Sequence, residues 1–248
     1  MSTDDTEQSP FTRPAFVWAA IVVGLVLVLG AVLAVHALTT GKTTASPPTA
    51  SGRPTAATST PSPSTGASEA SVCGLSGTVM AGTLSKAPAA TWAYEGTTAY
   101  PTSDTYGPGK TDANGVRYCF QHTPAGAVFA AANAVVQGSD AATAKPWLDY
   151  FAAAGPYRDT LLNSGGSGAA ASGVRLTIEG FRLLSYDGTT ARVDVAFRGS
   201  GSGSTVFGSG IYPLRWEGGD WKLAPTSASD LNMVAQIPDL AGYVSWGA

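Results

Sequence analysis

The sequence predicts a membrane-anchored protein whose folded part is an α+β domain. Three observations predict this: a long apolar run near the N-terminus, a tract of Ser, Thr, Pro and Ala after it, and a change from helical to alternating periodicity in the last part of the chain. The expected architecture is a single N-terminal transmembrane helix, a disordered Ser/Thr/Pro stalk, and helices packed on a curved antiparallel sheet of about four strands.

The apolar run Ala15–Val35 contains no charged residue and no proline. At the helical rise per residue it forms a helix about 32 Å long, enough to cross a hydrocarbon core of about 30 Å. We therefore expect a transmembrane helix within residues 15–38 and a disordered cytoplasmic tail over residues 1–14. Ala20 and Gly24 have the small-xxx-small spacing that lets two helices approach closely, so a homo-oligomer is one expectation.

The orientation of the span is predicted by the cysteines rather than by flanking charge. Arg13 lies on one side of the span and Lys42 and Arg53 lie on the other, so the charges decide little. Cys73 and Cys119 both follow the span, and two cysteines in a small domain are typical of an oxidising compartment. We expect an uncleaved, single-pass signal anchor in the cell membrane with an extracytoplasmic C-terminal domain, because a cleaved signal peptide has a shorter apolar region, of about 7 to 15 residues.

The composition changes abruptly after the span. Residues 39–72 are rich in Ser, Thr, Pro, Ala and Gly and contain few apolar residues to bury. Such a tract is typical of a disordered linker, and proline keeps its backbone extended. We expect this stalk to separate the membrane from the domain over residues 73–248.

The first part of that domain, residues 73–122, is expected to be an irregular leading arm. Turn signals at 106–109 and 114–115 separate short β-like pieces such as TWAYEGTTAY and VRYCF. The arm therefore lacks the long periodic segments that predict a core on their own.

Residues 123–225 contain the regular elements of the core. Thr123 is a helix N-cap, Pro124 occupies the favoured first position of the helix, and Gly138 is a stop signal. A second helical piece is expected over about 140–154, interrupted by Pro146, and a short turn follows it.

Alternating periodicity begins at Val174, where apolar residues occupy every second position. Gly180 is expected to be a bulge that resets the alternation, and Asp187-Gly188 turns the chain into the next strand. A Gly-Ser loop and a turn over residues 217–220 complete a meander of about four strands. We expect Arg175, Arg192 and Arg198 to lie on the solvent face of the sheet, near Glu179 and Asp194.

The tail over residues 226–248 is too apolar to lie free in solvent. It either packs back on the core or docks on a partner. Aromatic residues raise a similar choice, because they either fill the core or line a pocket between helices and sheet: Trp147, Tyr150, Phe151, Trp216 and Trp221.

Cys73 and Cys119 are the candidate disulfide of the domain. Two readings compete with it: a catalytic thiol assisted by His122, and a metal site using Cys119 and His122. A structural zinc site needs four ligands, and the folded part of the sequence has only one histidine. We interpret His122 as a neighbour of the helix cap or a plain surface residue.

Composition argues against several classes of function. The net charge is −3, and no cluster of Lys and Arg predicts nucleic-acid binding. The sequence contains no Gly-x-Ser-x-Gly elbow, and the residues around Lys110 do not complete a phosphate loop. We therefore expect a non-enzyme with no catalytic residue, no cofactor and no metal site.

Several short motifs carry a resemblance to known proteins: Cys73-Gly74-Leu75, Thr91-Trp92, Tyr118-Cys119-Phe120, His122-Thr123-Pro124-Ala125-Gly126-Ala127 and Gly219-Asp220-Trp221-Lys222. With these the chain resembles an uncharacterised actinobacterial family of single-span membrane proteins over roughly residues 73–225. The order of elements resembles the cone-shaped nuclear-transport-factor-like fold. The layout is similar to the inner-membrane assembly components of conjugation and type IV secretion machines.

The resemblance implies a non-catalytic extracytoplasmic interaction or assembly domain, with envelope proteins as partners. One alternative is a binding module for a small apolar or cell-wall-derived ligand. A dehydratase or isomerase is a third reading, and it requires an acid and a Tyr or His that converge inside the cone.

Overall fold

The computed structural model describes residues 70–164, 174–201, 203–231 and 234–248. The expected cytoplasmic tail (residues 1–14) and the expected transmembrane helix (residues 15–38) lie outside the described residues. So does the expected linker, except for residues 70–72. Within the described part, no helix has the length and apolar character needed to cross a membrane. The described residues belong to one unit, residues 68–248.

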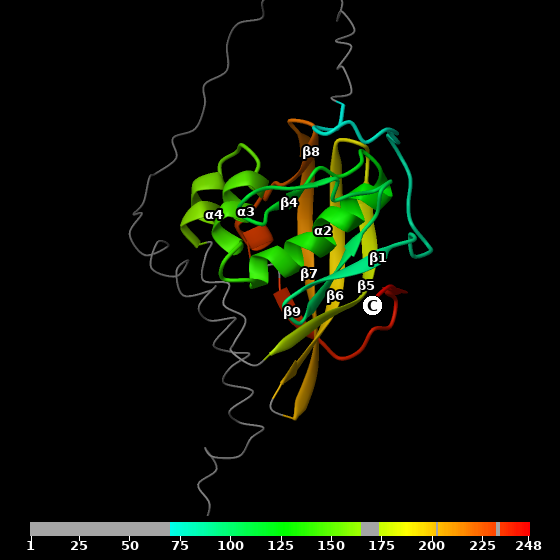
Figure 1. The fold of residues 1–248 in the computed structure, drawn as a ribbon, viewed down its shortest axis with the longest axis vertical. Helices are drawn as coiled ribbons and strands as arrows, with labels where there is room; N and C mark the ends of the chain where they lie inside the picture. The colour runs from blue at the N-terminus through cyan, green and yellow to red at the C-terminus, as the bar shows by residue number, and fades with distance from the viewer. Residues whose placement is uncertain (1–69, 165–173, 202, 232–233) are drawn as a thin grey trace, which may run out of the picture. The chain divides into compact units, whose positions relative to one another are not determined.

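An antiparallel sheet forms one layer of this unit (Figure 1). Its centre is a meander of β5 (Arg175–Tyr186), β6 (Thr190–Gly201), β7 (Ser204–Glu217) and β8 (Asp220–Leu223). The Gly-Ser segment expected as a loop is mostly strand, because Gly201 pairs with Ser204. The turn predicted over residues 217–220 is confirmed: Glu217 pairs with Asp220 across Gly218 and Gly219, both at positive φ.

The sheet has more strands than the sequence predicted. The C-terminal tail adds β9 (Val234–Ile237) beside β7 and β10 (Val244–Ser245) beside β5, which gives six strands among the described residues. Trp246, just after β10, is only 6% exposed and its ring packs edge-on against Phe129. Of the two expectations for the tail, packing back on the core is confirmed.

The bulge predicted at Gly180 is confirmed, because the pairing of β5 with β6 shifts register between Ile178 and Gly180. A side chain could not replace this glycine. A Cβ atom there would lie 2.7 Å from the carbonyl oxygen of Val244, so glycine lets β10 approach the edge of β5.

The helix α2 (Pro124–Ser139) begins where the sequence predicted. The Thr123 hydroxyl accepts a hydrogen bond from the amide of Gly126, and Pro124 follows the cap. Gly138 is not the stop, because the helix continues to Ser139. A Cβ atom at Gly138 would lie 3.1 Å from the Trp147 ring, so this glycine makes room for α3.

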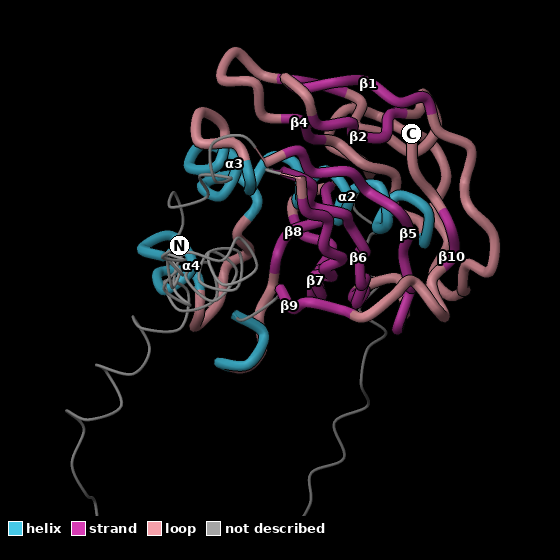
Figure 2. Tube along the Cα trace, turned by 90° about the horizontal axis from the view of Figure 1, so that it is seen from below, coloured by secondary structure: helices cyan, strands magenta, loops and turns pink. Residues whose placement is uncertain are grey.

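The helix α2 is buried on every side, from Pro124 to Gln137, and not along one stripe only. Figure 2 shows why: the sheet lies on one side of α2 and the leading arm lies on the other. A helix that is apolar all round is typical of such a central position. The layers are therefore the sheet, α2, and an outer layer made by the arm.

The arm is more regular than expected. It contains two hairpins, β1 (Thr91–Glu95) with β2 (Thr98–Thr102), and β3 (Lys110–Thr111) with β4 (Arg117–Tyr118).

The remaining helices are α3 (Ala144–Phe151), α4 (Arg158–Ser164) and the short 3-10 helix η2 (Ala228–Leu231). Pro146 does not interrupt α3, because it lies in the first turn, where a missing N–H costs no intrahelical bond. The predicted α+β class is thus confirmed: helices pack on a largely antiparallel sheet.

Candidate functional site

Cys73 and Cys119 form the predicted disulfide, with their Cα atoms 6.0 Å apart. Because each sulfur is bonded to the other, neither is available as a catalytic thiol or a metal ligand. In the part of the chain that the structure describes, no three His, Cys, Asp or Glu residues gather as a metal site. The Ser71 hydroxyl contacts the Cys119 sulfur at 3.0 Å, so the start of the described chain also packs on the bridge.

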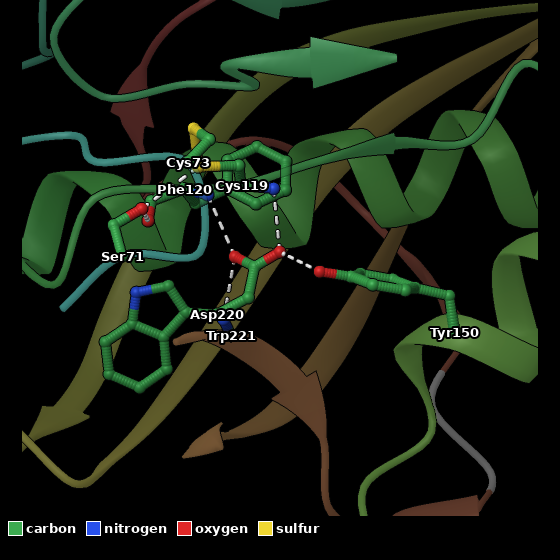
Figure 3. The surroundings of a disulfide bond; sticks show 7 residues. All are labelled: Ser71, Cys73, Cys119, Phe120, Tyr150, Asp220 and Trp221. Carbon is green, nitrogen blue, oxygen red and sulfur yellow. Dashed lines mark hydrogen bonds between the residues drawn. A yellow bond between two sulfur atoms is a disulfide. The ribbon is translucent and has the colours of Figure 1, made fainter. Parts of the chain in front are cut away.

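Cys119 is held by a carboxylate that is distant in the sequence. Its backbone has φ +68, a left-handed conformation that non-glycine residues rarely adopt. Its amide donates to Asp220 Oδ2 at 2.7 Å, and the next amide, that of Phe120, donates to Asp220 Oδ1 at 2.8 Å. Figure 3 shows this carboxylate below the disulfide. The Asp220 carboxylate therefore stabilises the strained turn that carries the bridge.

Two more donors complete the coordination of Asp220. The amide of Trp221 donates to Oδ1 at 2.9 Å, and the Tyr150 hydroxyl donates to Oδ2 at 2.8 Å. A carboxylate accepts about four hydrogen bonds, so Asp220 is saturated. We call Cys119, Phe120, Tyr150, Asp220 and Trp221 the Asp220 junction.

Burial shapes the proton affinities of this junction. Asp220 is fully buried, and the burial raises the pKa of its carboxyl group, while the amides of Phe120 and Cys119 oppose the rise. Burial and the Asp220 charge both raise the pKa of the Tyr150 hydroxyl. Tyr150 is therefore a neutral donor, and every partner of Asp220 presents a proton to it.

Lys222 lies beside the junction. Its Nζ atom is 3.0 Å from the centre of the Tyr150 ring and donates to the Tyr150 carbonyl oxygen at 3.0 Å. Burial lowers the pKa of this amine to about 8, while the negative charge of Asp220 opposes the fall. The cluster thus joins an acid, a phenol and an amine, the types of group that an acid–base enzyme requires. Its carboxylate, however, is already fully used by structural donors.

His122 is a structural residue rather than a surface residue. It is 4% exposed, and its ring stacks on Trp216 with centroids 3.9 Å apart. Its Nε2 atom interacts with the carbonyl oxygen of Gly188, at the turn between β5 and β6. The interpretation as a neighbour of the helix cap is confirmed, and the interpretation as a plain surface residue is wrong.

The aromatic residues named from the sequence divide between core and surface. Trp147, Phe151 and Trp221 are buried in the hydrophobic core, whereas Tyr150 and Trp216 are partly exposed. The first three therefore pack the core.

On the sheet face opposite α2, one charge prediction is confirmed and another is wrong. Arg198 pairs with Glu179, its Nε atom 2.6 Å from Oε1. Asp194 is not solvent-exposed: it is 1% exposed and pairs with Arg182, and the hydroxyl of Tyr243 donates to its Oδ2 atom at 2.8 Å. The C-terminal tail, which carries this tyrosine, covers the carboxylate.

The sequence reasoning missed a buried polar network between α2 and the arm. Asn133 Oδ1 accepts from the Arg117 side chain at 2.9 Å, and the Gln137 side chain bonds both backbone groups of Arg117. Arg117 also pairs with Glu95 and lies over the Tyr100 ring. The sequence did carry a signal for this network. Asn133 and Gln137 are four positions apart in a helix of mostly Ala and Val, so they lie on the same face of α2. Two polar residues on one face of an apolar helix indicate a polar partner elsewhere in the chain.

A family model described as "Domain of unknown function (DUF8175)" matches residues 52–245, which is most of the chain. No curated protein and no solved structure matches it.

Proposed function

The chain belongs to the DUF8175 family, and we propose that it is a single-pass membrane protein that presents a non-catalytic interaction or assembly domain outside the cytoplasm. In this proposal residues 15–38 anchor the chain, the tract that follows spaces the domain from the membrane, and the α+β unit has the cone form of nuclear-transport-factor-like domains. Its partners are proteins of the cell envelope, as in a conjugation or secretion complex.

The observation that carries the proposal is the disulfide between Cys73 and Cys119. Disulfides persist in oxidising compartments and are rare in the cytosol. Here the bridge is part of the fold: Cys119 is fully buried, and its amide is bound by Asp220 in the core. A domain built around such a bridge fits an extracytoplasmic location, and the apolar run before it supplies the membrane anchor.

The state of the buried acid supports a role without catalysis. The acid and tyrosine that a dehydratase or isomerase requires do converge, at Asp220 and Tyr150. Three of the four donors to this carboxylate are backbone amides that hold separate segments together. To take a proton from a substrate, Asp220 would have to give up these bonds, so the geometry favours a structural role.

An interaction role is favoured over a small-ligand role by the exposed apolar side chains. Val79 and Met80 are 42% and 50% exposed, and they lie at the turn between β5 and β6, where Met80 contacts Gly188. Large apolar side chains exposed side by side are typical of protein-binding surfaces. We place the contact with an envelope partner there.

Membrane topology is the first test. In cells expressing the full chain, Lys145→Cys places a thiol at a side chain that is 69% exposed, and Ser9→Cys places one in the N-terminal tail. A membrane-impermeant maleimide should label the first variant in intact cells and the second only after permeabilisation. The reverse pattern would overturn the extracytoplasmic placement.

The partner is the second test. The tagged full chain is cross-linked in its native membrane and purified, and the bound proteins are identified by mass spectrometry. Val79→Ser/Met80→Ser should lower recovery of the envelope partner at least fivefold, whereas Lys145→Ser, on an exposed helix face, should leave it unchanged. Equal recovery from the natural chain and both variants would contradict the proposed surface. Co-purification of a small molecule alone would favour the ligand-binding alternative.

A further inference from the structure

The hairpin of β1 and β2 is closed by a tight turn. Glu95 pairs with Thr98, so two residues, Gly96 and Thr97, form the turn, and Gly96 has the positive φ that such turns require at this position. The residues that flank a two-residue turn exchange two backbone hydrogen bonds, and bonded and non-bonded pairs then alternate along the hairpin.

This alternation leaves one edge of β1 unpaired. Counting from Glu95, the residues that bond to β2 are Glu95, Ala93 and Thr91, whereas the N–H and C=O groups of Trp92 and Tyr94 point away from β2. Within the described residues, no other segment donates to or accepts from these outward groups. Each copy of the domain therefore presents a short row of free backbone donors and acceptors.

The unpaired edge is also accessible. Figure 2 shows β1 as the outermost strand, with β2 between it and α2. The main contacts with α2 and β5 come from β2, and β1 reaches the core through its Trp92 side chain, which packs edge-on against Trp246. Tyr94 is 66% exposed, more than any other large hydrophobic residue in the described part of the chain. Among the described residues, no other strand pairs with β1 at this edge.

We propose that β1 pairs with β1 of a second copy of this chain, antiparallel and centred on Ala93. In this register Trp92 of each copy lies opposite Tyr94 of the other, so the outward groups bond in two symmetry-related pairs. The two hairpins become one four-stranded sheet. The partner is a second copy of this chain, because the same strand supplies both sides of the pairing. The inference does not depend on the membrane anchor.

The side chains of β1 are self-complementary in this register. Tyr94 gains an aromatic neighbour, because it lies across from Trp92 of the second copy, and such cross-strand aromatic pairs are favourable. Thr91 lies opposite Glu95, so no like charges meet, and Glu95 is already paired with Arg117 of its own chain.

The strand also lacks the usual protection against pairing. Edge strands that must stay single are guarded by charged side chains, especially lysine, by proline or by a bulge. The sequence of β1, Thr-Trp-Ala-Tyr-Glu, contains no lysine and no proline, and its pairing with β2 is regular throughout. Its one charged residue, Glu95, is neutralised by Arg117 of the same chain. The edge is thus suited to strand addition, a common mode of recognition by exposed strands.

Cysteine cross-linking of the full chain in detergent tests the register. At the two-fold axis the Ala93 Cα atoms would be about 4.5 Å apart, within reach of a disulfide. The Thr91 Cα atoms would be about 14 Å apart, beyond that reach. Under mild oxidation Ala93→Cys should form a disulfide dimer at least tenfold more abundantly than the matched control Thr91→Cys. Equal yields, or no dimer from Ala93→Cys, would overturn the proposal.

A proline tests the edge without disturbing the hairpin. Tyr94→Pro removes an N–H that points away from β2, and proline is tolerated in an edge strand at such a position. The measurement uses the full chain with Gly24→Leu, which removes the small-xxx-small pair of the expected span. Its native mass in detergent should fall from dimer to monomer when Tyr94→Pro is added, with an unchanged circular dichroism spectrum. Tyr94→Lys, which adds a guarding charge, should shift the equilibrium in the same direction. A dimer that persists in both variants would refute pairing through β1.

Discussion

The two most deeply buried aspartates of the described residues, Asp220 and Asp194, are stabilised in different ways. Asp220 is 0% exposed and Asp194 is 1% exposed, so both carboxylates are removed from water. Asp220 accepts hydrogen bonds on both oxygens, and three of its four donors are backbone amides. Asp194 is bound at Oδ2 by the side chains of Arg182 and Tyr243, and its Oδ1 has no partner among the described residues.

The difference lies in what each carboxylate joins. Backbone amides are fixed by the fold, so Asp220 ties the disulfide-bearing turn to β8 across 101 residues of chain. Arg182 is a half-exposed side chain, with 42% of its surface in solvent, so its pairing with Asp194 is weakened by water. Equal burial therefore does not mean equal contribution. We expect a carboxylate saturated by backbone amides to stabilise the fold more than a half-satisfied one bound by side chains.

The largest loss of stability is expected from removal of the disulfide, whose turn is bound by Asp220. Cys73 and Cys119 close a loop with a sequence separation of 46. The chain-entropy model gives such a bridge about 4 kcal/mol. Cys73→Ala/Cys119→Ala should lower the free energy of unfolding in urea by about that amount. A loss below about 1 kcal/mol would show that the Asp220 carboxylate holds the turn without the bridge.

The two aspartates can be compared directly by amide substitution. Asp220→Asn should lower the free energy of unfolding by about 3 kcal/mol, because an amide turns a donor group toward buried backbone N–H groups. Asp194→Asn, the matched control, should cost only about 1 kcal/mol, because the amide nitrogen fills a position without a partner. Urea denaturation of both variants at neutral pH measures the two losses. Equal losses would contradict the distinction between backbone and side-chain donors.

Asp230, on the same side of the sheet as Asp194, should make a smaller and pH-dependent contribution to stability. Burial raises the pKa of Asp230, but the amide and hydroxyl of Thr226 and the guanidinium of Arg192 outweigh it and lower the pKa to about 2. A carboxyl whose folded pKa is lowered stabilises the protein above its ordinary pKa of 3.8, and this contribution disappears as pH falls toward 2.

Asp230→Asn should therefore lower the free energy of unfolding by about 1 kcal/mol at pH 6 and have little effect at pH 2. The measurement is urea denaturation at both pH values. The control is Asp149→Asn, at an exposed surface pair, which should leave the free energy of unfolding unchanged at either pH. A difference between Asp230→Asn and the natural chain that persists at pH 2 would contradict the assignment.

Local sequence was sufficient where the signal lies within a few residues. Thr123 and Pro124 predicted the start of α2, because capping depends on neighbours along the chain. The alternation after Val174 predicted the strands, and Gly180 predicted the bulge in β5. The disulfide was predicted because only two cysteines are present. The burial of Asp194 and the network around Arg117 depend on distant partners and were not predicted.

The sequence by itself determined the α+β class, the order of helices before strands, and the pairing of Cys73 with Cys119. Only the tertiary structure decided that Asp220 and Asp194 are buried, that α2 is covered on both sides, and that the tail adds β9 and β10 to the sheet. The physical reason is the separation of the groups involved. A helix cap or a strand period is set by residues a few positions apart. The burial of Asp220 depends instead on donors about 100 residues away, which meet it only in the folded chain.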